Sequence, residues 1–335
     1  MYIYQKNMLK HITSLLIIVC SITIHTKIAA SNKIIKPAYL KKGDSVAIVA
    51  PAGIVRDSVP INNAILWLKS WGLHVKLGEH LYNNEHHFSG TDEERTSDLQ
   101  EALDNENIKA IWCARGGYGT GRIIDDLNFE KFLQNPKWII GFSDITVLHS
   151  HLHTLGVETL HAVMCTSQKN QNEEKLESIK SFKLALFGND ISYEIPSSKY
   201  NKIGNTSGQI VGGNLTLLQN MVGTVSSINT TGKILFIEEV GEYLYHIDRM
   251  LWGLKRNGYF DNCNGIIIGG MTKIKDNSTP FGKTVEEIVL DVTKEFNFPI
   301  IFDFPAGHDD LNLALYMGRE LKMKVGKKKS ELKFK

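Results

Sequence analysis

Three short, mostly apolar runs constrain the fold of this chain more than any other feature of its sequence. They span residues 46–50, 108–114 and 138–140, and a glycine-containing turn follows each of them. Runs of this kind are typical of strands that are buried on both faces. Apolar residues then recur at helical spacing, as in Leu148 and Leu152. This alternation predicts an α/β fold with a parallel, doubly wound sheet, whose loops gather at the carboxyl ends of the strands.

The length of the chain, 335 residues, is sufficient for two domains. The strand and helix pattern weakens between residues 188 and 205 and then resumes. We therefore expect an N-terminal domain over 31–190, a linker over 191–206 and a C-terminal domain over 207–335. The last residues, 320–335, alternate apolar and charged side chains in the manner of edge strands.

The N-terminus has the layout of a signal peptide. Lys6 and Lys10 precede an apolar run over 12–24, and small residues follow at Ala29 and Ala30. The apolar run is short for a transmembrane helix. We predict a signal peptide over 1–30 and export to the periplasm, with an uncleaved membrane anchor as the alternative. Cys20 follows the bulky Val19, which disfavours a lipid-attachment site.

Charge and cysteine usage exclude several classes of partner. The formal net charge is +2, and the one lysine run, over 327–329, is typical of a solvated tail. Hence we expect no nucleic-acid partner. Cys113, Cys165 and Cys263 are too widely spaced for a disulfide framework, and the absence of a CxxC motif argues against structural zinc.

Ser143 lies on the turn between the apolar run over 138–140 and the helix pattern that follows. At such a turn a hydroxyl is exposed at the end of a sheet, beside the free N–H groups of a helix N-terminus. The alternative is that Ser143 only caps the helix. Taken alone, this stretch favours the cap.

A second glycine-rich turn, Gly116-Gly117-Tyr118-Gly119, follows the run over 108–114. It does not match the GxGxxG pattern, and no Walker lysine follows it. Its backbone N–H groups could still form an oxyanion hole beside a nucleophile. Arg115 and Arg122 flank the turn and could bind a substrate carboxylate. The alternative is a purely structural turn.

Further chemically active side chains lie in the C-terminal half. Glu238 and Glu239 are neighbours on one predicted strand, so they point to opposite faces and only one can face a cleft. His308 follows a strand-like stretch and a loop. Ser143, one of these glutamates and His308 have the roles of nucleophile, orienting acid and general base.

A metal site is the competing interpretation of the histidines. His149 and His153 are four residues apart on one predicted helix. That spacing can hold a metal, but Ser150 stands where an HExxH motif has its glutamate.

Seven stretches of the chain, in order, resemble the LD-carboxypeptidase family of serine peptidases, which includes murein tetrapeptide carboxypeptidases and microcin-immunity relatives. The matching stretches are residues 43–53, Gly90-Thr91-Asp92-Glu93-Glu94-Arg95, Arg115-Gly116-Gly117-Tyr118-Gly119, Gly141-Phe142-Ser143-Asp144, Gly212-Gly213-Asn214-Leu215, Glu238-Glu239-Val240-Gly241-Glu242 and Gly307-His308. The chain departs from the family at Glu239, because members often carry Glu-Asp at this pair.

The resemblance implies roles for individual residues. Ser143 would be the nucleophile, Glu238 the orienting acid and His308 the base. The backbone N–H groups of Gly117 and Asp144 would form the oxyanion hole. The expected substrate-binding residues are Arg115 and Gly116. The implied architecture is an N-terminal flavodoxin-like domain and a C-terminal swivelling-type α/β domain, with the active site between them.

The implied activity is that of a carboxypeptidase acting on peptidoglycan, the cell-wall polymer. It would release the terminal D-alanine of a murein tetrapeptide, next to an L-centre of diaminopimelate or lysine, through an acyl-enzyme. No metal or organic cofactor is needed for this chemistry. The resemblance also implies a homodimer. Two alternatives remain: an immunity-type hydrolase of a peptide–nucleotide antibiotic, and a non-catalytic wall-peptide binding protein.

Overall fold

The fold is described from a computed structural model that covers residues 34–168 and 172–335. The predicted signal peptide, residues 1–30, lies outside these ranges. Within them, no helix is both long enough and apolar enough to span a bilayer. Cys113, Cys165 and Cys263 are buried and unpaired, in agreement with the prediction that they form no disulfide framework.

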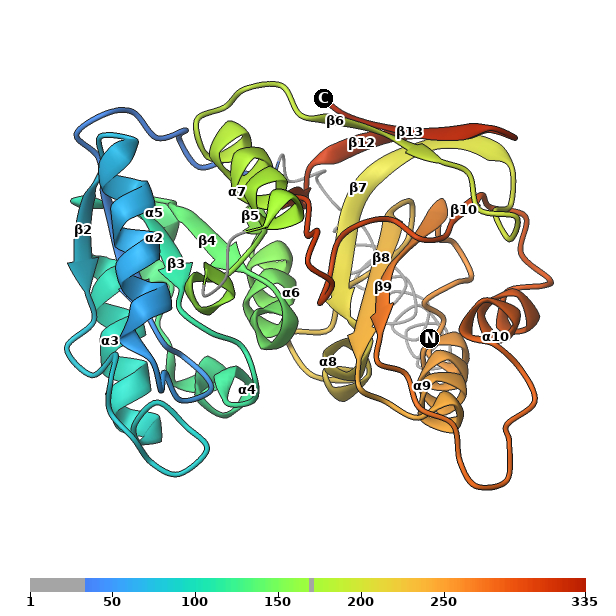
Figure 1. The fold of residues 1–335 in the computed structure, drawn as a ribbon, viewed down its shortest axis with the longest axis horizontal. Coiled ribbons are helices and arrows are strands. Elements are labelled where there is room, and N and C mark those ends of the chain that lie inside the picture. Colours follow the sequence, from blue (N-terminus) through green and yellow to red (C-terminus); the bar gives the residue numbers. More distant parts are fainter. Residues whose placement is uncertain (1–33, 169–171) are drawn as a thin grey trace, which may run out of the picture. The chain divides into compact units, whose positions relative to one another are not determined.

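The first sheet has six strands in the order β11-β5-β4-β3-β1-β2 (Figure 1). All strands but β11 come from the N-terminal half and run parallel. Their bounds are β1 (Ser45–Val49), β2 (His74–Leu77), β3 (Ile108–Cys113), β4 (Trp138–Gly141) and β5 (Thr159–His161). β11 (Leu315–Met317), from near the C-terminus, pairs antiparallel with β5. The parallel sheet predicted from the apolar runs is therefore present, with one added strand from the C-terminal half.

Helices cover both faces of this sheet. On one face Val46 and Ile48 pack with α2 (Ser58–Ser70) and α7 (Glu173–Leu186). On the other, Ala47 and Val49 pack in the same core as the remaining helices of this half. Those helices are α3 (Asp92–Asp104), α4 (Thr120–Ile123), α5 (Glu130–Gln134) and α6 (Thr146–Thr154). The strands are apolar without interruption because both of their faces are buried.

The second sheet has seven strands in the order β10-β9-β8-β7-β12-β13-β6 (Figure 1). Its parallel part comprises β7 (Gly204–Asn214), β8 (Ile234–Val240), β9 (Gly265–Thr272) and β10 (Ile300–Ile301). Its antiparallel part comprises β12 (Glu320–Val325), β13 (Lys329–Phe334) and β6 (Ser192–Pro196). One face shares its core with α8 (Leu215–Asn220), α9 (Leu244–Arg256) and α10 (Val285–Val292).

The structure differs from the sequence prediction at two places in this sheet. The stretch 191–206, expected as a linker, contains the edge strand β6 and the first residues of β7. β12, expected as an edge strand, is an interior strand between β7 and β13. Both differences come from long-range strand pairing that no local pattern reveals. β6 pairs with β13, about 130 residues away, and β12 pairs with β7 as well as with β13.

A buried ion pair connects the two sheets. The backbone of Arg319 accepts a hydrogen bond from Ile210 of β7 (3.0 Å). Its side chain donates to Glu158, just before β5, at 2.9 and 2.5 Å, and to the Tyr39 hydroxyl at 2.9 Å. The guanidinium also lies 3.5 Å from the centre of the Tyr316 ring. Arg319 is therefore bonded to the second sheet by its backbone and to the first by its side chain.

We predict that Arg319→Met lowers the free energy of unfolding by about 3–5 kcal/mol, because Glu158 would remain buried without its partner. Urea unfolding followed by circular dichroism measures the change. The double variant Arg319→Met/Glu158→Met should unfold at a higher urea concentration than the single variant.

The matched control is Lys329→Met, which removes the exposed ion pair to Glu194 and should leave the unfolding midpoint unchanged. Unfolding of Arg319→Met at the wild-type urea concentration would show that the buried pair does not stabilise the fold.

Candidate active site

Ser143 occupies a strained turn between β4 and α6. β4 ends at Gly141, and Ser143 begins a single 3-10 turn, Ser143–Ile145, that leads into the helix. The φ angle of Ser143 is +62°, a left-handed conformation that costs an L-residue about 1–2 kcal/mol. The N-cap of α6 is Ile145, and no side chain caps the helix. Ser143 is therefore not a helix cap, and its hydroxyl is available for another partner.

That partner is His308, from the loop after β10. The Nε2 atom of His308 lies 3.0 Å from Ser143 Oγ, and its Nδ1 atom lies 2.6 Å from Glu238 Oε2. Because a carboxylate only accepts, Nδ1 carries the proton, and Nε2 is left to accept from the hydroxyl. The Phe142 ring packs edge-on against the imidazole, 4.9 Å between centres. The three side chains thus form one chain of hydrogen bonds.

The two glutamates of β8 point to opposite faces, as the strand alternation predicts. Glu238 is fully buried and bonds to His308. Glu239 accepts from the Asn214 side chain at 3.0 Å and from the N–H and hydroxyl of Thr216 at 2.8 and 2.7 Å. Glu239 therefore fixes the start of α8, and Glu238 is the member of the pair that faces Ser143.

The buried pair changes the acid–base properties of both partners. Burial raises the pKa of Glu238, and the hydrogen bond from His308 opposes the shift. Burial also disfavours a charge on His308, but the hydrogen bond and charge of Glu238 outweigh it and raise the pKa of His308 above its ordinary 6.5. A histidine with this environment holds a proton firmly once it has taken one.

The Gly116-Gly117 turn packs directly against Ser143. A Cβ atom on Gly116 would lie 3.0 Å from Ser143 Cβ, 3.2 Å from Ser143 Oγ and 3.3 Å from the Asp144 nitrogen. Any larger residue here would require Ser143 or the Asp144 backbone to shift. The two groups expected to form an oxyanion hole, at Gly117 and Asp144, are therefore on segments that contact each other beside the hydroxyl.

Two buried charged residues hold this turn, and sequence reasoning assigned neither a structural role. Arg95 is 1% exposed and donates to the carbonyls of Pro51 (2.6 Å) and Gly119 (3.0 Å). The Asp144 carboxylate accepts from the Thr120 N–H at 2.8 Å. Their only sequence signal was that both lie in stretches matching the family.

The arginines considered for carboxylate binding have protein partners. Arg115 is half-buried and donates to the Ile54 carbonyl at 2.8 Å. Arg122 forms an ion pair with Asp92. Among the described residues, Arg122 has a carboxylate partner and Arg115 bonds to a backbone carbonyl, so the role of Arg115 as a carboxylate clamp stays a prediction.

The histidines of α6 serve the fold. The ring nitrogens of His149 lie 2.8 Å from the Thr159 hydroxyl and 3.0 Å from the Gly141 carbonyl, and His153 bonds to Gln209. Burial lowers the pKa of each to about 4. The part of the chain that the structure describes has no group of three or more His, Cys, Asp or Glu residues placed to hold a metal ion.

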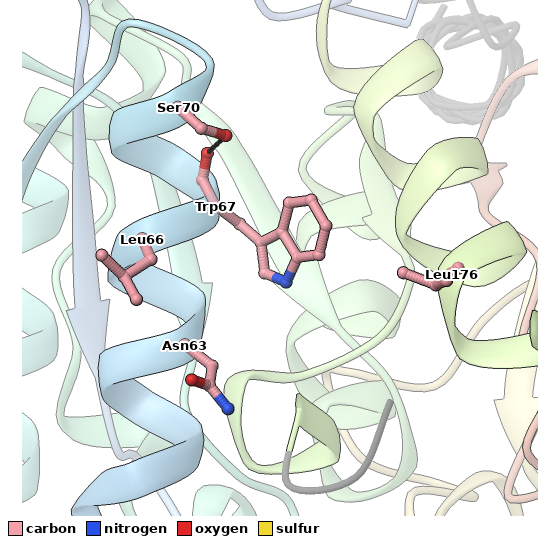
Figure 2. Close-up of a pocket in the computed structure, with 5 residues that line it drawn as sticks. All are labelled: Asn63, Leu66, Trp67, Ser70 and Leu176. Carbon is pink, nitrogen blue, oxygen red and sulfur yellow. Dashed lines mark hydrogen bonds between the residues drawn. The ribbon is translucent and has the colours of Figure 1, made fainter. Parts of the chain in front are cut away.

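A hollow of about 460 Å³ lies elsewhere, between α2 and α7. Figure 2 shows Trp67 and Leu176 pointing toward one another across it, with Asn63, Leu66 and Ser70 on the same helix as Trp67. It has no titratable side chain in its lining, so it cannot supply acid–base chemistry. The hydrogen-bonded residues Ser143, His308 and Glu238 are the better candidate for an active site.

Known proteins match nearly the whole described chain. The N-terminal domain model of the LD-carboxypeptidases matches residues 46–162, and the C-terminal domain model matches 207–323. A probable murein peptide carboxypeptidase of Bacillus subtilis is 34% identical over 88% of this chain and 92% of its own length. A murein tetrapeptide carboxypeptidase of Pseudomonas aeruginosa is 31% identical over 82% and 91%.

A solved structure supports the same relationship. The muramoyltetrapeptide carboxypeptidase of Oxalobacter formigenes superposes with a TM-score of 0.79 at 27% identity, over 87% of this chain and 98% of its own. Its two-domain α/β architecture is shared by the two sheets described above. On these matches, the chain belongs to the LD-carboxypeptidase family.

Proposed function

We propose that this carboxypeptidase releases the terminal D-alanine of a murein tetrapeptide through a Ser143–His308–Glu238 triad. The observation that carries the proposal is the chain of hydrogen bonds, 3.0 Å from Ser143 to His308 and 2.6 Å from His308 to Glu238. The substrate class follows from the Pseudomonas aeruginosa relative, which is named a murein tetrapeptide carboxypeptidase. The scissile bond would join the L-centre of the diamino acid to D-alanine.

In the first step, Ser143 Oγ attacks the carbonyl carbon while His308 Nε2 takes the hydroxyl proton. The resulting imidazolium is stabilised by the buried Glu238 carboxylate, which also holds Nδ1 as the protonated nitrogen. The negative charge that develops on the carbonyl oxygen is accepted by the N–H groups of Gly117 and Asp144. The dense packing of Gly116 against Ser143 supports this assignment.

In the second step, His308 gives its proton to the amine of the leaving alanine, and the acyl-enzyme remains on Ser143. Water, activated by the same imidazole, then releases the shortened peptide. Each role uses a group whose position is fixed by a buried neighbour, so little reorganisation is needed during turnover.

The proposed site of action is outside the cytoplasm, where the wall lies. It rests on the sequence of residues 6–30 alone. Cell fractionation should place the full-length protein in the periplasmic fraction, and mass spectrometry of that protein should show loss of a segment ending near Ala30. Recovery of the intact chain from the cytosol would contradict export.

We expect Ser143→Ala to lower turnover at least ~10⁴-fold while the protein stays folded, because the residual rate comes from binding and the oxyanion hole alone. The measurement is mass spectrometry of a purified murein tetrapeptide after incubation. Loss of one alanine with the wild type only is the expected result.

Circular dichroism of Ser143→Ala is the control for folding. Wild-type-like turnover by this variant would exclude Ser143 as the nucleophile. Absence of alanine release by the wild type, with hydrolysis of an aminoacyl–nucleotide amide instead, would favour the immunity-type hydrolase.

The pH dependence of kcat/KM tests the acid–base pair. His308 must be neutral to accept the serine proton, and its pKa is raised; the rate should therefore fall on acidification at a pH above the ordinary histidine value of 6.5. Glu238→Gln removes the carboxylate that raises this pKa, so the acid limb should move to lower pH and kcat should fall about 10⁴-fold.

The control for Glu238→Gln is Glu194→Gln, on the exposed edge strand β6, which should leave the profile unchanged. An acid limb that stays at the same pH in Glu238→Gln would show that Glu238 does not set the pKa of His308.

A further inference from the structure

A cavity of about 290 Å³ lies beside His308, and no step of the mechanism above uses it. Its lining includes Phe142 and His308 from the triad region and Thr166, Ser167 and Lys175 from the segment after β5. The volume is at the lower limit of small-molecule pockets, roughly 300–1,000 Å³. It suits one small residue better than a length of peptide.

His308 connects the cavity to the leaving-group side of the scissile bond. In the first sheet, β4 lies between β3 and β5. The Gly116 turn follows β3, whereas the cavity is lined by Phe142, after β4, and by residues that follow β5. The oxyanion and the leaving amine are on different sides of a tetrahedral carbon, and the amine must reach His308, which lines the cavity.

The cavity contains one lysine, Lys175, beside the carboxylates of Asp309 and Asp310. Of its described lining residues, Lys175 alone carries a permanent positive charge, and its side chain is 22% exposed. It forms a 3.4 Å ion pair with Asp310. Asp310 is 53% exposed and also accepts from the Asn172 side chain at 2.8 Å. An ammonium group has three donors, so a long ion pair with an exposed carboxylate leaves Lys175 able to bind a second acceptor.

Asn312, which also lines the cavity, carries an unused donor. Asn312 is 2% exposed, and its Oδ1 atom lies 3.1 Å from both the Gly307 nitrogen and His161 Nε2. Its Nδ2 atom is buried and has no acceptor among the described residues. A buried donor without a partner is unfavourable by about 1–3 kcal/mol. A ligand oxygen that reaches this wall would remove that penalty.

We propose that this cavity binds the C-terminal carboxylate of the scissile residue, with Lys175 as its charged anchor. The proposal rests on the carboxypeptidase function proposed above. A terminal residue differs from an internal one by its free carboxylate, and a cation on the leaving-group side recognises that difference. The hydroxyls of Thr166 and Ser167 can donate to the same group. The volume of about 290 Å³ matches one small terminal residue.

The test compares two probes: a murein tetrapeptide with a free C-terminal carboxylate and the same peptide with a C-terminal carboxamide. The wild type should prefer the acid. Lys175→Met should lower kcat/KM for the acid by about 10- to 100-fold, the range for a hydrogen bond to a charged group, and leave the amide unchanged. Lys175→Arg, which keeps the charge, should retain most of the preference for the acid.

The matched control is Lys180→Met, on the exposed side of the same helix, where Lys180 pairs only with Glu177 in the described structure. Lys180→Met should leave kcat/KM unchanged for both the acid and the amide peptide. Rates are measured by mass spectrometry of released alanine or alaninamide.

Three results would overturn the proposal. An equal loss of kcat/KM for the acid and the amide peptide in Lys175→Met would show that Lys175 has only a structural role. If the loss of kcat/KM in Lys175→Met depended on whether the diamino acid is diaminopimelate or lysine, Lys175 would lie on the acyl side of the scissile bond. Wild-type rates in Lys175→Met would show that the lysine binds nothing. Failure of the wild type itself to cleave either probe would instead refute the proposed function, and the anchor with it.

Discussion

Glu238 is a carboxylate with no exposed surface, and the arrangement of the active site depends on how it is satisfied. A buried charge is stable only when it is paired and hydrogen-bonded. Here the partner is His308, 2.6 Å away, and the other nitrogen of that imidazole meets Ser143 from the first sheet. One interaction therefore fixes the tautomer of His308, orients it toward Ser143 and raises its pKa. The contact of His308 with Ser143 joins residues that are 165 positions apart in sequence.

Close backbone approaches between the two halves of the chain bring Ser143 to His308 and Glu238. β7 ends against the first turn of α6, where the Asn214 nitrogen donates to the Thr146 hydroxyl at 3.0 Å. A Cβ atom on Gly213 would lie 2.4 Å from that hydroxyl, so a larger residue would displace Thr146 at the start of α6. Gly116 makes a similarly close approach to Ser143 itself. Strain at Ser143 persists because packing on both sides leaves its backbone no alternative.

Buried polar residues outside the triad keep these segments in place. Arg95 fixes the loops after β1 and β3, Glu239 fixes the start of α8, and Arg319 joins the two sheets through Glu158. Each satisfies backbone or carboxylate groups that would otherwise be buried without a partner. The site is therefore preorganised by charges that have no contact with the reacting atoms, and Lys175 stands apart because its partner is half exposed.

The sequence by itself determined the local features. The apolar runs predicted the parallel sheet, the Gly141–Ser143 turn predicted an exposed hydroxyl at its edge, and strand alternation required the two glutamates to diverge. These follow from short-range backbone geometry. The resemblance to a family, not periodicity, selected Glu238 over Glu239.

Only the tertiary structure decided how distant segments meet. It placed β6 and β11 in their sheets, paired Arg122 with Asp92 so that its charge is already neutralised, and committed His149 to the contact between β4 and β5. It also brought Lys175 and Asn312 to one cavity beside His308. Contacts of this kind depend on packing between elements far apart in the chain, and no local propensity or spacing encodes them.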